Sequence, residues 1–110
     1  MLNFYPYYEK LLKDKLKWTT IRLGDQRTKF AVGDLVMLTI GWSENENNLK
    51  LYKVQIQEVY YKRIKDLNND DLDGESPDCT SNKAIPFVIS AIYRKVVSDE
   101  DYVTVIKWKY

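Results

Sequence analysis

The chain has 110 residues, of which 45% are hydrophobic and 30% charged, and its net charge is +1. This length predicts a single domain over residues 1–110, and the composition excludes a disordered chain. Since the net charge is close to zero, any attraction for nucleic acid has to come from a local patch.

Cysteine and histidine are scarce. Cys79 is the single cysteine, and the chain has no histidine. A lone cysteine cannot form an internal disulfide, which favours a reducing compartment, and a zinc site lacks its usual ligands. No apolar stretch has the length of a membrane span or the pattern of a leader peptide. We therefore expect a soluble cytoplasmic protein without membrane contact, bound metal, other cofactor or obligate protein partner.

The N-terminal residues predict a short strand followed by a helix. Leu2–Phe4 has the strand pattern, and Pro6 suits the first position of a helix. Tyr8, Leu11 and Leu12 then recur at the spacing of one buried helix face.

The segment from Lys15 to Asp25 concentrates charge and hydroxyl groups. The β-branched run that begins at Thr19 predicts a strand, on which Thr20 and Arg22 share one face. Lys17 has the wrong parity for that face. It has to reach Thr20 from the turn that precedes the strand.

The middle of the chain predicts two long strands. Leu35–Ile40 has apolar residues on both faces, which predicts a strand buried on both sides. Residues 42–48 are expected to form a polar hairpin loop. Leu51–Tyr61 alternates as a strand should, but the alternation changes phase beyond Ile56. The change predicts a β-bulge near Glu58.

The last third begins with an acidic segment. Residues 66–78 contain six acids and no base. A helix follows with Ile85, Val88, Ile89 and Ile92 as its buried stripe, and residues 102–108 predict a closing strand. These elements predict an α+β fold that is mainly β: a small barrel or strongly curved sheet with two or three peripheral helices. Its ligand site is expected at the barrel mouth or between barrel and helix.

Four motifs in this order resemble the ASCH domain, a family of PUA-like β-barrels. Lys17-Trp18-Thr19-Thr20-Ile21-Arg22 resembles its signature strand, and Gly33-Asp34 opens a later strand as in the family. Asp66-Leu67 is followed by Glu75, and Val105-Ile106-Lys107-Trp108 closes the chain. Three positions differ: Lys15 lies where the family has a glycine shortly before the lysine, Trp18 where a small polar residue often follows it, and Ser76 where a glycine often follows the acid.

The resemblance implies an enzyme. Small single-domain bacterial members include amidohydrolases that act on N(4)-acetylcytidine with a lysine, a threonine and a glutamate. These correspond by motif to Lys17, Thr20 and Glu75. Arg22 corresponds to an arginine that contacts substrate or phosphate.

These groups suit amide hydrolysis, which needs a nucleophile, a base, an acid for the departing nitrogen and a donor for the oxyanion. Burial, or Arg22 nearby, would disfavour the ammonium form of Lys17 and let it take a proton from Thr20 or from water. Glu75 would return the proton to the cytosine amine. Lys15 would add a substrate contact.

The aromatic residues Trp18, Tyr60, Tyr61 and Tyr93 are candidates for stacking on a base, although most aromatics in so small a barrel belong to the core. We therefore expect a modified nucleoside or RNA as the ligand.

Two alternatives to the amidohydrolase remain open. The first is a non-catalytic RNA-binding module, because residues 1–30 contain seven basic and three acidic side chains. The residues that would hold phosphate are Lys15, Lys17, Arg22, Arg27 and Lys29. An acidic segment in the same cleft would oppose this function, since carboxylates repel phosphate. The second is a ribonuclease that uses the same lysine and glutamate.

Overall fold

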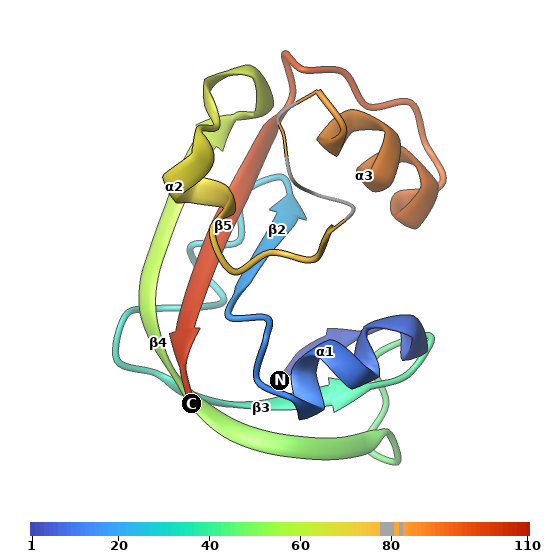
Figure 1. The fold of residues 1–110 in the computed structure, drawn as a ribbon, viewed down its shortest axis with the longest axis vertical. Coiled ribbons are helices and arrows are strands. Elements are labelled where there is room, and N and C mark those ends of the chain that lie inside the picture. The colour runs from blue at the N-terminus through green and yellow to red at the C-terminus, as the bar shows by residue number, and fades with distance from the viewer. Residues whose placement is uncertain (78–80, 82) are drawn as a thin grey trace.

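The computed structural model describes residues 1–77, 81 and 83–110 (Figure 1). Asp78 and Cys79 lie outside the described residues. The strands are β1 (Leu2–Phe4), β2 (Thr19–Leu23), β3 (Leu35–Ile40), β4 (Leu49–Arg63) and β5 (Tyr102–Lys109). The α-helices are α1 (Glu9–Lys13), α2 (Asn69–Leu72) and α3 (Ile85–Tyr93), and two 3₁₀ turns are η1 (Pro6–Tyr8) and η2 (Ile64–Asp66).

The five strands form one curled sheet in the order β1-β3-β4-β5-β2. β1 is parallel to β3, and the other neighbours are antiparallel. β4 bends along its length, so that the sheet curls around α1 and α3 (Figure 1). The pairing of β4 with β5 shifts between Ile56 and Glu58, which confirms the predicted bulge. Bulges increase local twist and bending, and this one accompanies the curl.

The sheet remains a half-barrel because β1 and β2 lie at its two edges and do not pair with each other. The prediction of an α+β fold, mainly strand, with peripheral helices is confirmed. The strand at Leu35–Ile40 has the predicted bounds, but Leu35 is exposed. The reason is that β1 pairs only with the second half of β3, from Leu38 onward, and leaves the start of β3 uncovered.

Two apolar clusters stabilise this arrangement. One joins β1, β3 and β4 to the N-terminal helix and includes Phe4, Leu12 and Leu38. The other lies between β2, β5 and α3 and includes Ile21 and Ile89. Burying each large aliphatic side chain contributes about 1.5–3 kcal/mol. The candidate site lies where the two clusters meet.

Candidate active site

Lys17 enters the interior from the segment between α1 and β2. After α1 ends at Lys13, the chain reverses at Lys15, whose φ of 57° is left-handed. The amide of Leu16 donates to the carbonyl of Leu11 at 2.9 Å and closes the turn. This conformation costs residues with a Cβ roughly 1–2 kcal/mol, whereas glycine adopts it freely. A glycine at this position would relieve that cost.

Lys17 and Glu75 form a buried ion pair. Nζ of Lys17 contacts Oε1 of Glu75, and only 3% of the lysine and 4% of the glutamate side chain is exposed. The ammonium donates to the carbonyl of Thr19 at 2.8 Å and lies 5.6 and 5.4 Å from the ring centres of Phe4 and Tyr8. Either charge would be costly to bury alone. The carbonyl and the ring faces replace part of the water that the ammonium has lost.

Ser76 orients the carboxylate of Glu75. Its amide donates to Oε1 at 2.7 Å and its hydroxyl donates to the same atom at 3.2 Å. The serine thus adds a side-chain donor that a glycine would not supply. Lys17 contacts the same oxygen, so that the serine and the lysine hold the carboxylate together.

Backbone contacts hold the acidic segment against the sheet. The carbonyl of Gly74 accepts hydrogen bonds from the amides of Trp18 and Thr19, at 2.9 and 3.1 Å. Nζ of Lys107 donates to the carbonyl of Asp73 at 3.1 Å. A Cβ at Gly74, where φ is 83°, would lie 2.3 Å from the Trp18 ring, so that only glycine fits. These contacts bring the carboxylate of the pair to its ammonium.

Thr20 and Arg22 share one face of β2, as the alternation predicts. Nε of Arg22 donates to Oγ1 of Thr20 at 3.2 Å, and Nη2 donates to the carbonyl of Asn3 at 2.9 Å. The guanidinium thus bridges the two edge strands at the point where the half-barrel is open. Burial lowers the pKa of Arg22 from its ordinary value, but an arginine stays charged at neutral pH.

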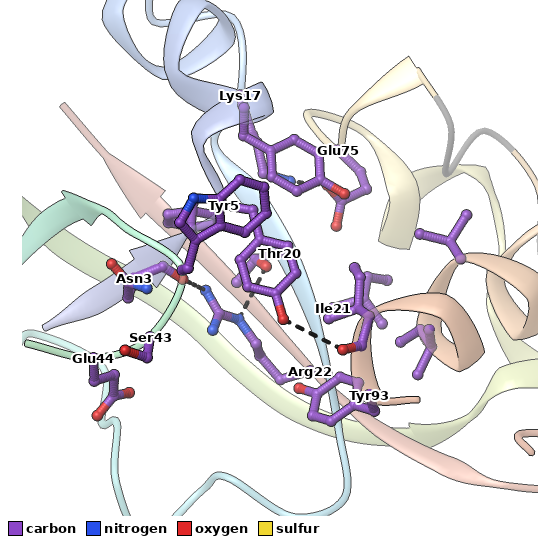
Figure 2. Close-up of a pocket in the computed structure, with 16 residues that line it drawn as sticks. Asn3, Tyr5, Lys17, Thr20, Ile21, Arg22, Ser43, Glu44, Glu75 and Tyr93 are labelled. Carbon is purple, nitrogen blue, oxygen red and sulfur yellow. Dashed lines mark hydrogen bonds and ion pairs between the residues drawn. The ribbon is translucent and has the colours of Figure 1, made fainter. Parts of the chain in front are cut away.

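A cavity of about 260 Å³ opens at this gap (Figure 2). Lys17, Thr20, Arg22 and Glu75 all line it. Its apolar wall includes residues of α3, and two of these, Val88 and Ile92, were predicted to be buried in the core. They are only partly buried because they face the cavity. The volume is slightly below the usual range of about 300–1,000 Å³ for ligand sites, which suits a ligand of nucleobase or nucleoside size.

Only one of the other predicted contact residues, Tyr93, lines the cavity. The Tyr93 hydroxyl accepts from the amide of Leu23 on the open edge of β2 at 3.3 Å. Lys15 and Trp18 do not line it. Nζ of Lys15 lies 5.2 Å from the ring centre of Tyr52, and the Trp18 ring packs over Gly74.

Further aromatic and acidic residues, which the sequence patterns did not indicate, line the cavity as well. Tyr5, from the segment after β1, and Trp42, Ser43 and Glu44, from the hairpin between β3 and β4, all line it. Figure 2 shows Ser43 and Glu44 on the opposite side of Arg22 from Tyr93. A tryptophan directly after a strand, at the start of a polar loop, was the available signal.

No group of three histidine, cysteine, aspartate or glutamate side chains in the described part of the chain could hold a metal ion. Among the same residues, no helix has the length and apolar character needed to span a membrane.

The fold has a counterpart among solved structures. The crystal structure of an ASCH domain from Lactobacillus crispatus JV V101 matches it with a TM-score of 0.64, over 98% of this chain and 79% of the other, at 12% sequence identity. This chain has the ASCH-domain fold. No family model matches the sequence, and no curated protein matches it. The similarity to the ASCH domain is therefore one of fold.

Proposed function

We propose that this ASCH-fold protein binds a modified nucleoside in the cavity and hydrolyses an N-acyl group from a cytidine-type base. The observation that carries the proposal is the buried ion pair between Lys17 and Glu75, which opens on the same cavity as Thr20 and Arg22. An ammonium and a carboxylate that are shielded from water, beside a hydroxyl and a guanidinium, provide every group that amide hydrolysis requires.

In the proposed reaction the oxygen of Thr20, or of a water molecule that it orients, attacks the acyl carbonyl. The hydroxyl proton passes to the pair formed by Lys17 and Glu75, and the pair returns it to N4 of the base as the C–N bond breaks. If Thr20 is the nucleophile, water then cleaves the acyl ester. The products in both cases are the free amine of cytidine and a carboxylic acid.

Arg22 is suited to stabilise the negative charge that develops. It has five N–H donors, and hydrogen bonds to Thr20 and Asn3 use two of them in the described part of the chain. The remaining donors can reach an oxyanion in the cavity. Its bond to Oγ1 of Thr20 also leaves the hydroxyl hydrogen to be donated elsewhere, as a nucleophile that loses its proton must do.

The charges favour a nucleoside over RNA. Among the residues that the structure describes, two cations and two acids line the cavity, which gives no positive excess for a phosphate chain. Glu75 and Glu44 are the acids, and both would repel phosphate. Among the basic residues considered for RNA binding, Lys17 is paired with Glu75 and Arg27 with Asp25.

The test is release of cytidine from N(4)-acetylcytidine, followed by chromatography. We expect Thr20→Val to lower kcat by about 10²-fold or more, because general acid–base and nucleophilic groups contribute about 10²–10⁴-fold. Thr20→Ser should retain most of the activity. Lys17→Met and Glu75→Gln should abolish it, whereas the matched exposed controls Lys15→Met and Asp70→Asn should not.

Three results would contradict the proposal. One is a wild-type protein that releases no cytidine. Another is a Lys17→Met or Glu75→Gln variant that is folded and as active as wild type. The third is cleavage of labelled RNA that persists in Thr20→Val, which would identify a ribonuclease.

A further inference from the structure

We propose that Trp42 is the residue that stacks on the ring of the ligand, and that Asn3 and Asn48 hold it in place for this purpose. The ligand class, a pyrimidine nucleoside, rests on the proposed function. Binding of the ring does not require hydrolysis, so the two proposals can fail separately.

Trp42 lines the cavity but is 69% exposed. Its ring packs against that of Tyr5, with 5.3 Å between the centres and 43° between the planes. Tyr5 is itself anchored to α3, because its hydroxyl donates to the carbonyl of Ile92 at 3.3 Å. The indole is therefore supported by a partner while much of its surface is open, which is the arrangement of a stacking platform.

The hairpin that carries Trp42 is tied to β1 on both sides of the loop. The amide of Gly41 donates to the carbonyl of Phe4 at 2.9 Å, and Nδ2 of Asn3 donates to the carbonyl of Gly41 at 3.0 Å. Nδ2 of Asn48 donates to Oδ1 of Asn3 at 3.0 Å and to the carbonyl of Ser43 at 2.6 Å. Trp42 lies between these anchored residues, so its position is built into the fold.

The amide of Asn48 lies where a Cβ on the residue before Trp42 would be, so a larger residue at Gly41 would displace it. A Cβ at Gly41 would lie 2.3 Å from Oδ1 of Asn48. The close approach lets the amide of Asn48 close the loop.

The contacts that hold Trp42 in place are also connected to the reacting groups. The carbonyl of Asn3 accepts from Arg22, while its side chain holds the hairpin. Asn3 thus sets the position of the guanidinium and of the indole together. Val88 and Ile92 of α3 also line the cavity, which gives a planar ring further apolar contacts.

The ligand probe is cytidine, which the proposed reaction would form and cannot consume. The chain has three tryptophans, at positions 18, 42 and 108. We expect cytidine to quench the tryptophan fluorescence of the wild type, and the quenching to disappear in Trp42→Phe. Trp18→Phe is the matched control and should keep it, because Trp18 does not line the cavity.

Stacking also predicts how substitutions of Trp42 change the affinity for cytidine. Base–aromatic stacking corresponds to a loss of roughly 5- to 150-fold in affinity on alanine substitution. Calorimetry should therefore show a Kd for cytidine higher by that factor in Trp42→Ala, and by less than about fivefold in Trp42→Phe, which keeps a ring. Asn48→Ala should raise KM for N(4)-acetylcytidine with little change in kcat, since it frees the loop without touching the reacting groups.

Unchanged cytidine affinity in Trp42→Ala, or quenching that survives in Trp42→Phe, would overturn the inference. Failure of the wild type to bind cytidine would overturn it too. If the wild type binds cytidine through Trp42 but releases none from its acylated form, the hydrolase proposal fails and the stacking role stands.

Discussion

The buried pair of Lys17 and Glu75 makes a quantitative prediction for stability. With 3% and 4% of the two side chains exposed, removal of one partner leaves an uncompensated charge in the interior. Such a change costs about 3–5 kcal/mol, a large part of the total of about 5–15 kcal/mol expected for a domain. We expect Lys17→Met to have this effect, which corresponds to a fall in Tm of roughly 12–20 °C for a chain of this size.

Glu75→Gln should cost less than Lys17→Met. The ammonium of Lys17 keeps the carbonyl of Thr19 and the faces of Phe4 and Tyr8 when the carboxylate is lost. When the ammonium is lost, the carboxylate of Glu75 keeps the two donors of Ser76 but loses its charged partner. The double variant should be more stable than Lys17→Met alone, because neither charge is then buried.

The measurement is a double-mutant cycle from urea unfolding followed by circular dichroism. A coupling free energy of about 2 kcal/mol or more is expected for the buried pair. The exposed pair of Lys10 and Asp14, whose charged atoms lie 2.9 Å apart, is the control and should show little coupling. A coupling for Lys17 and Glu75 as small as that of the control would refute the reasoning. Activity of the single variants has to be measured well below their lowered Tm.

Three further substitutions test other parts of the site's scaffold. Lys15→Gly should raise Tm by several degrees, because it relieves a left-handed residue that costs roughly 1–2 kcal/mol; no rise in a thermal melt would contradict the turn geometry. Gly74→Ala should lower the free energy of unfolding by more than 1 kcal/mol, since its Cβ would meet the Trp18 ring; a neutral result in urea would contradict that contact. Burial opposes ionisation of Asp71, yet its hydrogen bonds, including that from Lys62, lower its pKa. The ionised carboxylate of Asp71 therefore stabilises the fold at neutral pH, and this contribution is lost as the pH falls below about 4. Asp71→Asn should lose less stability on acidification than the wild type.

Local pattern was sufficient for most of the elements. Alternation along β2 predicted that Thr20 and Arg22 share a face, and the hydrogen bond between them confirms it. The change of phase after Ile56 predicted the bulge, because the side-chain period of a strand is two and an extra residue reverses it.

The candidate site could be predicted only in part from the sequence. Spacing and motif order pointed to Lys17, Thr20, Glu75 and Arg22, all of which line the cavity. They predicted that Lys17 and Glu75 act in one site, but not that the two side chains form an ion pair buried from water, nor that Trp42 faces the same cavity.

Periodicity along the chain predicted strands, turns and the polar face of β2 because those features depend on neighbours a few residues away. Other features depend instead on which strands pair. These are the gap between the edge strands β1 and β2, the hydrogen bonds of Gly74 to the start of β2, and the position of residues 42–44. Strand pairing joins segments that are distant in the sequence, and it is determined by the packing of the two apolar clusters. The tertiary structure alone therefore decided that four polar groups and one exposed indole surround a single cavity.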